Sequence, residues 1–305
     1  MNLSHYLSIA PEIESAVRDG KPVVALESTI LSHGLPWPQN LEFAYRVQQI
    51  IRQEGAVPAT TAIINGRLRV GLEDFELEML CSGKQVEKAS RRDLPILVAT
   101  GKTGATTVAS TMILASLAGI RVFSTGGIGG VHRGAQTTMD ISADLQELAR
   151  TPVAVVCAGA KMILDIGLTL EYLETMGVPV LGMRTSDFPA FYCRKSGFGV
   201  DCSVQDEQQA ARIIKTKWDL GLQGGVLIAN PVPEQYALDF DEMDRTIELA
   251  LQDAERNGIK GKRLTPYLLD KLLQYTDGKS LATNLQLAYH NARTAAKIAV
   301  EFSRL

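Results

Sequence analysis

The stretch that decides the fold is "RVFSTGGIGGVHRGAQTTMDISADLQELARTPVAVVCAG", at residues 121–159. It begins with a short apolar run, passes through a glycine-rich loop, continues as a helix-like pattern and ends in a second apolar run. A continuously apolar run of this length is typical of a strand that is covered on both faces. Two such strands with a helix between them indicate a parallel sheet in an α/β fold.

Similar apolar runs, most of them separated by helical patterns, extend this arrangement along the chain. They lie at "PVVALEST" (22–29), "ILVAT" (96–100), "PVLGM" (179–183) and "GVLIAN" (225–230). An amphipathic helix is predicted over residues 39–55, where apolar residues recur at three- and four-residue intervals. "TTAIINGRLRVGL" (60–72) has two β-rich runs around Asn65-Gly66, which favours a type I′ hairpin and adds antiparallel pairing.

From about residue 243 the pattern becomes helical. One helix is expected to end at Asn257-Gly258, another to start at Thr265-Pro266, and a last one to run from Ser280 onward. We therefore expect a three-layer α/β/α fold with a mixed, mostly parallel sheet and a helical C-terminal cover. No linker or internal repeat divides the chain, which predicts a single domain over residues 1–305.

The composition favours a soluble globular protein with a small-molecule partner. The chain has 305 residues, of which 46% are hydrophobic and 21% charged, and its net charge is −3. Lys and Arg form no long block, which argues against a nucleic-acid surface. No signal peptide is apparent, and the longest nearly apolar run, residues 107–120, is shorter than the roughly 20 residues that a membrane span needs. Four cysteines without C-x-x-C spacing indicate reduced thiols and a cytoplasmic location.

Three phosphate-binding signatures are nearly present and all fail, one of them, "CAGAK" (157–161), because it lacks the three glycines. Gly101-Lys102-Thr103 resembles the end of a P-loop, but Ile96 stands where the first glycine is required. No three glycines around "GGIGGVHRG" satisfy G-x-G-x-x-G. Kinase and dinucleotide-binding functions therefore have weak support. Glycines after strands still expose backbone N–H groups, so a site for a phosphate monoester stays open.

Two ionisable residues follow buried strands directly, at the sheet edge where open α/β folds bind ligands. Glu27 ends "VVALE", and Lys161 follows "VAVVCAGA". Each could simply end its strand near water or join an ordinary ion pair. The functional alternative is a carboxyl acid or base together with an amine nucleophile. Burial lowers the pKa of a lysine, and a free amine can form a Schiff base with a sugar aldehyde.

Asp140 and Asp144 stand four residues apart in "DISADLQELA". In the first turns of a helix, both carboxylates would lie on one face, where a hard cation such as Mg²⁺ or Mn²⁺ would relieve their repulsion. The alternative is that they complement the dipole at the start of the helix. Spacing alone leaves both possibilities open.

Several other polar residues are candidates for ligand contacts. Lys88, Arg91 and Arg92 could form a phosphate clamp or a charged surface turn. Asn284 lies on the apolar face of the last helix, where a buried amide needs partners, either backbone groups or a substrate. His132 in the glycine-rich loop could contact a phosphate or a base, or serve only the structure of the loop.

Long collinear blocks resemble the pseudouridine-5′-phosphate glycosidase family. The weakest likeness lies in residues 195–222 and in residues 73–88, where this chain is one residue shorter than the family pattern. The matching blocks are "KPVVALESTILSHGLPWPQN" (21–40), "GAVPATTAII" (55–64), "SRRDLP" (90–95), "GKTGATTVASTMILASLAGI" (101–120), "STGGIGGVHRGAQTTMDISADLQELA" (124–149), "VVCAGAKMILDIGLTLEYLET" (155–175), "ANPVPEQYA" (229–237) and "SLATNLQLAYHNA" (280–292).

The resemblance implies a single catalytic domain that reversibly cleaves pseudouridine 5′-phosphate to uracil and ribose 5-phosphate. It implies Glu27 as proton donor and Lys161 as covalent nucleophile, with one Mn²⁺ per subunit at Asp140. Substrate contacts implied by the resemblance fall on Lys88, Val108, Ser142, Ala143 and Asp144. The family forms homotrimers with an α/β/α core.

The substrate's glycosidic bond joins carbon to carbon, so the leaving base has no glycosidic nitrogen or oxygen to protonate, and the two-carboxylate route of most glycosidases is poorly suited. A lysine can instead attack C1′ while Glu27 protonates the ring oxygen, after which uracil departs and water releases the sugar. Two rivals remain at this stage. A sugar-phosphate aldolase would share the lysine but cleave within the sugar, and a non-catalytic sensor would bind ribose 5-phosphate without forming product.

Overall fold

The computed structural model describes residues 3–83, 85–259 and 261–305. A mixed sheet runs through its centre in the strand order β1-β4-β3-β2-β7-β9-β13-β11-β12, and two short strands, β5 and β6, extend it beside β3. The strands are β1 (Leu7–Ile9), β2 (Val23–Leu26), β3 (Val57–Ile64), β4 (Arg67–Val70), β5 (Glu87–Ala89), β6 (Gly104–Thr106), β7 (Val122–Ser124), β9 (Ala154–Cys157), β11 (Val180–Met183), β12 (Cys202–Val204) and β13 (Val226–Ala229). A separate antiparallel pair joins β8 (Val131–His132) to β10 (Leu164–Asp165).

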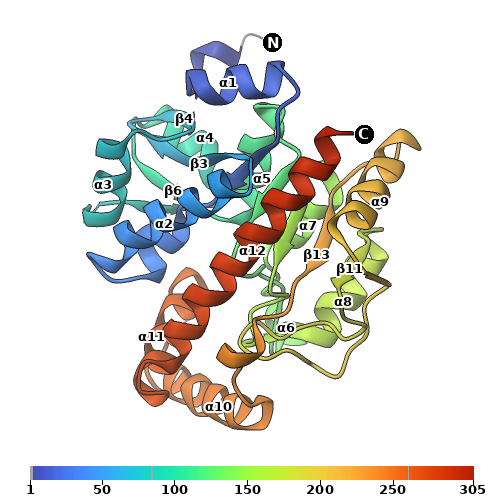
Figure 1. Ribbon diagram of the computed structural model, residues 1–305. Coiled ribbons are helices and arrows are strands. Elements are labelled where there is room, and N and C mark those ends of the chain that lie inside the picture. The colour runs from blue at the N-terminus through green and yellow to red at the C-terminus, as the bar shows by residue number, and fades with distance from the viewer. Residues whose placement is uncertain (1–2, 84, 260) are drawn as a thin grey trace.

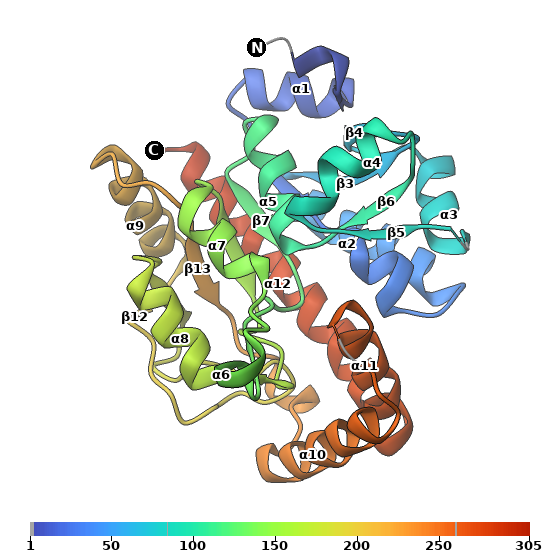
Figure 2. The same ribbon diagram turned by 180° about the vertical axis from the view of Figure 1, so that it is seen from behind.

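Helices cover both faces of the sheet. Helices α2, α9 and α12 lie over the face seen in Figure 1, and α5, α7 and α8 lie over the opposite face, seen in Figure 2. The helices are α1 (Pro11–Arg18), α2 (Gln39–Gln53), α3 (Asp74–Ser82), α4 (Leu94–Ala99), α5 (Val108–Leu117), α6 (Ala135–Thr138), α7 (Ala143–Arg150), α8 (Ile166–Thr175), α9 (Glu207–Asp219), α10 (Phe240–Arg256), α11 (Leu264–Tyr275) and α12 (Lys279–Ser303). The expected three-layer α/β/α fold is confirmed.

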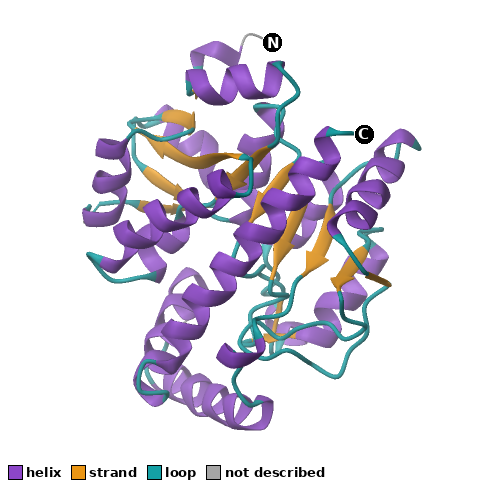
Figure 3. Cartoon of the chain, in the orientation of Figure 1, coloured by secondary structure: helices purple, strands orange, loops and turns teal. Residues whose placement is uncertain are grey.

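The core of the sheet is parallel because its strands are buried on both sides. Strands β2, β7, β9 and β13 are fully buried, pair in parallel with their neighbours and consist almost wholly of Val, Ala, Leu, Ile and Phe. Antiparallel pairing occurs where β4 and β6 flank β3. The β3–β4 turn has Asn65 and Gly66 both at positive φ, which confirms the type I′ hairpin. Figure 3 shows the strands enclosed between the two helical layers.

One predicted strand is wrong. Residues 96–100 belong to helix α4 and the turn after it, and not to the sheet. Ser90 and Asp93 form a reciprocal capping box just before this helix, and Pro95 occupies its first turn, so the local signals start a helix. Leu94 and Leu97, three residues apart, are buried while Ile96 is exposed, which is a helical pattern too short to recognise from five residues.

The C-terminal part is helical, as expected. Helix α10 ends at Arg256 beside Asn257-Gly258, and α12 begins one residue before Ser280. Helix α11 begins at Leu264, so Thr265 lies inside its first turn and is not its cap, contrary to the prediction. Helices α10 and α11 form a hairpin that projects at one end of the molecule (Figure 1). None of the helices in the described residues has both the length and the hydrophobicity to cross a membrane.

Candidate functional site

The candidate site lies where four neighbouring parallel strands end. Strands β2, β7, β9 and β13 occupy adjacent positions in the sheet, so the residues that follow them meet at one edge. Glu27 follows β2, Thr125 follows β7 and Asn230 follows β13, while Lys161 lies four residues beyond β9. The two ionisable residues singled out in the sequence are therefore brought together, and the charge of Lys161 acts on the Glu27 carboxyl.

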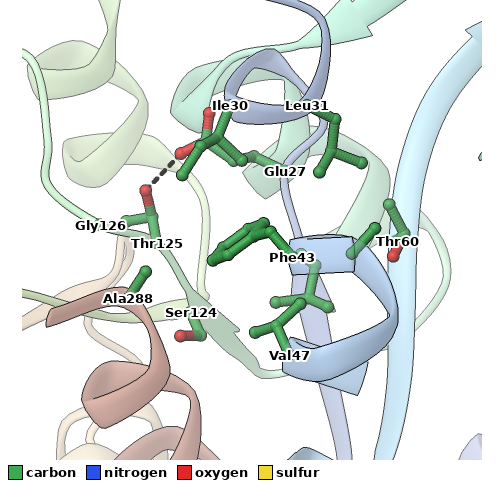
Figure 4. A pocket seen from close by; sticks show the side chains of 12 residues that line it. Glu27, Ile30, Leu31, Phe43, Val47, Thr60, Ser124, Thr125, Gly126 and Ala288 are labelled. Carbon is green, nitrogen blue, oxygen red and sulfur yellow. Dashed lines mark hydrogen bonds between the residues drawn. The ribbon is translucent and has the colours of Figure 1, made fainter. Parts of the chain in front are cut away.

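Glu27 lies at the edge of a pocket with about 390 Å³ of empty space, its open mouth included. Thr125 Oγ1 donates a hydrogen bond to Glu27 Oε1. Figure 4 shows these two groups facing each other, with apolar side chains such as Phe43 and Val47 forming other walls of the pocket. The π-helical turn Ile30–Gly34 begins three residues after Glu27, and its Ile30 and Leu31 also line the pocket.

These surroundings raise the pKa of the Glu27 carboxyl, chiefly because burial disfavours its charged form. The positive charges of Lys161 and Lys88 and the hydrogen bond from Thr125 oppose this increase, and the negative charge of Asp144 adds to it. A carboxyl with a raised pKa keeps its proton to higher pH than an ordinary glutamate. Glu27 is thus suited to donate a proton.

Lys161 is anchored to the glycine-rich loop. Its Nζ donates to the Gly127 carbonyl oxygen at 3.1 Å, and its backbone N–H donates to the Ile128 carbonyl at 3.1 Å. The side chain is only partly buried, so its amine can meet a ligand at the strand ends. Because Ile128 also pairs in parallel with Ala160, the loop runs alongside the segment that carries the lysine.

Asp144 connects the glycine-rich loop to a helix on the far face. Its Oδ1 accepts from the Ala109 N–H at 3.0 Å, and its Oδ2 accepts from the Gly129 N–H at 2.8 Å. A Cβ on Gly129 would lie 2.7 Å from Asp144 Oδ2 and 2.3 Å from Ser142 Oγ, so only glycine fits there. Both carboxylate oxygens are thus engaged by backbone groups. This shows how Asp144 holds the site together, and its direct substrate contact stays a prediction.

Asp140 and Asp144 do not share a helix face, contrary to the expectation from their spacing. Helix α7 begins at Ala143 with Ser142 as its N-cap, so Asp140 lies in the loop before it. Ser142 Oγ accepts from the Asp144 N–H at 3.3 Å, which is the usual start signal of a helix.

Two apolar residues at the site lie at helix starts, where the backbone N–H groups have no hydrogen-bond partner within the helix. Val108 is the first residue of α5, and Ala143 is the first residue of α7. The N–H groups of a first turn have no partner within the helix and attract anions. Since the Val108 side chain is buried, a ligand there would meet its backbone and not its side chain. The two helix starts are joined by the Asp144–Ala109 hydrogen bond.

Of the predicted phosphate clamp, only Lys88 reaches the site. Its charge acts on Glu27, His33 and His132. Arg91 instead pairs with Glu147, at 2.7 Å between Nε and Oε2, and Arg92 lies on the surface beside Asp93. The alternative of a charged surface turn therefore holds for the two arginines.

His132 and Asp140 lie together on the loop that follows the glycines. The His132 N–H donates to the Asp140 carbonyl at 3.0 Å. Burial lowers the pKa of His132, the Asp140 carboxylate opposes this, and the charges of Lys161 and Lys88 add to it. A histidine in this environment tends to be neutral, and its ring can both donate and accept a hydrogen bond.

A metal ion at Asp140 would have few protein ligands. The Asp140 side chain is partly exposed, whereas the Asp144 oxygens are already bonded to backbone N–H groups. Among residues 3–83, 85–259 and 261–305, no three His, Cys, Asp or Glu side chains gather in a metal-binding arrangement. One carboxylate, with water and phosphate oxygens for the other positions, fits the way in which Mg²⁺-like cations bind.

Asn284 lies on α12 opposite the glycine-rich loop. Its side chain is 9% exposed, and its Oδ1 is buried without a hydrogen-bond partner in the described part of the chain. This oxygen lies 3.4 Å from the position that a Cβ on Gly126 would take. Of the two alternatives for this amide, a ligand is thus favoured over backbone partners for its oxygen.

Sequence reasoning missed Thr125, Asn230 and Asn291. Thr125 and Asn230 each follow a buried strand directly, which is the same signal that identified Glu27. Asn291 lies seven residues after Asn284, two turns further along the same face of α12, and is fully buried. Polar residues at these positions carried the signal, although none of them is ionisable.

Comparisons with known proteins agree with this geometry. The sequence model of the family described as "Indigoidine synthase A like protein" matches residues 12–301. A pseudouridine-5′-phosphate glycosidase from Caldanaerobacter subterraneus subsp. tengcongensis is 59% identical over 303 residues, covering 99% of each chain. One from Alkaliphilus metalliredigens is 59% identical over 304 residues, covering 100% of this chain and 99% of that one.

Solved structures show the same fold. The prealnumycin C-glycosynthase AlnA, solved in complex with ribulose 5-phosphate, superposes with a TM-score of 0.92 at 40% identity, covering 99% of this chain and 98% of that one. An indigoidine synthase A-like protein from Thermotoga maritima has a TM-score of 0.89 at 37% identity, covering 98% and 97% of the two chains.

Proposed function

This chain belongs to the family of indigoidine synthase A like proteins, and from that premise we propose that it is an enzyme that cleaves the C-glycosidic bond of pseudouridine 5′-phosphate. The reaction is reversible, and its products are uracil and ribose 5-phosphate. The observation that carries the proposal is an amine, Lys161, beside a carboxyl with a raised pKa, Glu27, at one sheet edge. The relatives that match over the whole chain carry the name of this activity.

The first step opens the ribose ring. The Lys161 amine bonds to C1′, the bond from C1′ to the ring oxygen breaks, and that oxygen takes the proton of Glu27. The nitrogen, now bonded to C1′, sheds a proton, for which the Glu27 carboxylate is the nearby base. The product of this step is an open-chain sugar that joins Lys161 to uracil through C1′.

The second step breaks the carbon–carbon bond. The lone pair of the Lys161 nitrogen forms a double bond to C1′ as the bond from C1′ to uracil C5 breaks, and C5 takes the proton that Glu27 received from the nitrogen. Uracil leaves, and a Schiff base remains between Lys161 and the sugar. Water then adds to C1′, the carbon–nitrogen bond breaks, and ribose 5-phosphate leaves as the free aldehyde.

The remaining polar groups at the site are proposed to hold the substrate. The first N–H groups of α5 and α7, at Val108 and Ala143, together with Lys88 and Ser142, suit a phosphate. The unpartnered Asn284 Oδ1 suits an N–H or hydroxyl donor of the substrate. Asp140 would hold Mn²⁺, whose positive charge would balance the negative charge of the phosphate. These roles stay predictions.

The function is tested by uracil release from pseudouridine 5′-phosphate, with and without Mn²⁺. We expect the metal-loaded protein to release uracil and to lose most of this activity after chelation. The activity should recover when Mn²⁺ or Mg²⁺ is added back. Because Asp140→Asn removes the charge of the proposed ligand, this variant should need a higher metal concentration for half-activation. Sugar fragments without uracil would indicate an aldolase, binding of ribose 5-phosphate without turnover would indicate a sensor, and full activity without metal would remove the cation from the proposal.

We also propose that the protein is a homotrimer in the cytoplasm. Large apolar side chains on its surface, among them Trp37, Phe75 and Leu220, provide area for subunit contacts. The cysteines are free thiols, in keeping with a reducing compartment. Sedimentation equilibrium should give three times the 33.1 kDa of one chain, and a monomer or dimer mass would contradict the trimer.

A further inference from the structure

Asn291 is a fully buried polar residue near the site, and both its amide nitrogen and its amide oxygen are hydrogen-bonded. Its Nδ2 donates to the Thr125 carbonyl at 2.9 Å and to the Gly126 carbonyl at 3.2 Å. Its Oδ1 accepts from Asn230 Nδ2 at 3.0 Å. The exposed fractions are 0% for Asn291 and 2% for Asn230. Three elements that are distant in sequence, the loop after β7, the end of β13 and helix α12, therefore meet at one side chain.

The orientation of this amide follows from its partners. Carbonyl oxygens can only accept, so the amide nitrogen of Asn291 must face Thr125 and Gly126. Its oxygen then faces Asn230, which supplies the required donor. Asn230 is itself fixed, because its backbone N–H donates to the Cys157 carbonyl at the end of β9 at 2.8 Å. The pair cannot turn over without losing hydrogen bonds.

The two carbonyls that Asn291 holds lie between the groups that hold Glu27 and Lys161. The Thr125 hydroxyl donates to Glu27, and the Gly127 carbonyl accepts from Lys161 Nζ at 3.1 Å. Residues 125–127 are thus a three-residue bracket that touches the acid at one end and the amine at the other. Glycine at positions 126 and 127 gives this bracket little rigidity of its own.

The neighbours of Asn291 indicate that packing alone does not require an amide here. Of the neighbouring positions on this face of α12, Leu287, Ala288 and Ala295 are apolar and Thr294 is polar, and all four are buried. An apolar side chain here would leave the Thr125 and Gly126 carbonyls and the Asn230 amide without their partner, so the amide serves to hold these groups in place. The presence of an amide at position 291 is explained if it fixes the geometry of residues 125–127.

We propose that Asn291, oriented by Asn230, is a positioning residue that fixes the separation of the Glu27 carboxyl and the Lys161 amine through the bracket Thr125–Gly127. It touches neither substrate nor a reacting atom. This inference rests on the proposed function, because it assigns Asn291 to the alignment of that acid and that amine.

The test is Asn291→Leu, which keeps the size of the side chain and removes its two donors. Turnover should fall about 100-fold, the scale at which small misplacements of catalytic groups act, while KM changes by less than about threefold. The pH profile should also change. The hydrogen bond from Thr125 holds down the pKa of Glu27, so its loss should move the high-pH decline of activity to higher pH. The other charges that act on Glu27, those of Lys161, Lys88 and Asp144, are unaltered by the substitution.

The matched control is Thr283→Val on the same helix. Thr283 is also buried and donates to a loop carbonyl, that of Tyr236, at 2.8 Å. It should lower thermal stability, though by less than Asn291→Leu because only one carbonyl loses its partner, and it should leave kcat and the pH profile unchanged. Equal loss of kcat in both variants, or an unchanged pH profile in Asn291→Leu, would make Asn291 merely structural and overturn the proposal.

A double-substitution cycle with Thr125→Val tests the route through the bracket. If Asn291 acts through the Thr125 hydroxyl, the shift in the pH profile should be no larger in the double variant than in Thr125→Val alone, which removes that hydroxyl completely. Two shifts that simply add would contradict this route. Asn230→Leu, which removes one of the three hydrogen bonds of the Asn291 amide, should give a smaller fall in kcat and a smaller shift in the same direction. It replaces Asn291→Leu if that variant does not fold, and normal kcat in a folded Asn230→Leu would then count against the proposal.

Wild-type uracil release separates this inference from the proposed function. If the unaltered protein releases no uracil, the proposed function fails, whatever the variants do. If the unaltered protein is active while Asn291→Leu matches it in kcat and pH profile, only the positioning by Asn291 fails.

Discussion

Lys161→Met should abolish uracil release, with turnover reduced on the order of 10⁶-fold, the scale seen when a covalent nucleophile is removed from a hydrolase. Methionine keeps much of the length of the side chain but has no amine to bond to C1′. Steady-state release of uracil from pseudouridine 5′-phosphate measures the effect. Lys102→Met is the matched control, because Lys102 is an exposed lysine that pairs with Glu87 at 3.4 Å, and its loss should leave turnover unchanged.

The covalent role of Lys161 has its own readout. Borohydride added during turnover should reduce the Schiff base to a stable secondary amine, so that the mass of a ribose 5-phosphate adduct appears on the peptide that contains Lys161. Lys161→Met should show no such adduct. An adduct on another lysine, or none in an enzyme that still releases uracil, would contradict the Schiff-base mechanism.

Glu27→Gln should lower turnover by about 10²- to 10⁴-fold and leave substrate binding in place, because the amide keeps the shape of the carboxyl but cannot protonate the ring oxygen. The wild-type enzyme needs Glu27 protonated, so its activity should decline as the pH rises through the raised pKa of this group. Glu54→Gln, which loses only a surface pair with Arg293, serves as the control. Full activity in Glu27→Gln would assign proton donation to another group.

Glu27→Gln should also raise the melting temperature at neutral pH. The folded-state pKa of Glu27 lies above the unfolded value, so folding at neutral pH must bind a proton or bury a charge, and this costs stability. The stabilisation that this carboxyl contributes is fully present below the unfolded pKa and is lost as the pH rises through the folded one. Glutamine removes this dependence, so the difference between the melting temperatures should shrink toward pH 4. A lower melting temperature at neutral pH would argue against a raised pKa.

Most of the central strands could be predicted from local sequence patterns, and the one wrong strand prediction has a physical cause. Parallel strands that are covered on both faces consist almost entirely of apolar residues, so they can be recognised in the sequence as apolar runs. This holds for the strands at 23–26, 122–124, 154–157 and 226–229. The run at 96–100 looks the same over five residues but lies in a capped helix, because Ser90, Asp93 and Pro95 start it earlier. Short apolar runs need their flanking signals to be assigned.

Site residues could be predicted where an ionisable residue follows a strand. They could not be predicted where their arrangement depends on the exact start of a helix or on hydrogen-bond partners that are distant in sequence. Their position after apolar runs singled out Glu27 and Lys161 as candidates, with an ordinary ion pair as the alternative. The prediction that Asp140 and Asp144 share one helix face is wrong, because Ser142 is the N-cap of α7 and Asp140 lies before it. The place of Asn291 on the buried face of α12 could be read from the sequence, but its partners Thr125 and Asn230 could not, since they lie 166 and 61 residues away. The catalytic roles of the site residues, and the single catalytic domain over residues 1–305, stay predictions.

Helix α12 has a consequence for the order in which this protein becomes active during synthesis. It follows every strand of the sheet in sequence, yet it supplies Asn291, which grips the loop after β7. A ribosome adds roughly 5–20 residues per second, so Glu27 and Lys161 are both made many seconds before the helix that aligns them. A nascent chain that has not yet produced residues 279–303 therefore carries the acid and the amine without their common support. Full turnover at this lysine is therefore expected only once synthesis has passed the helix.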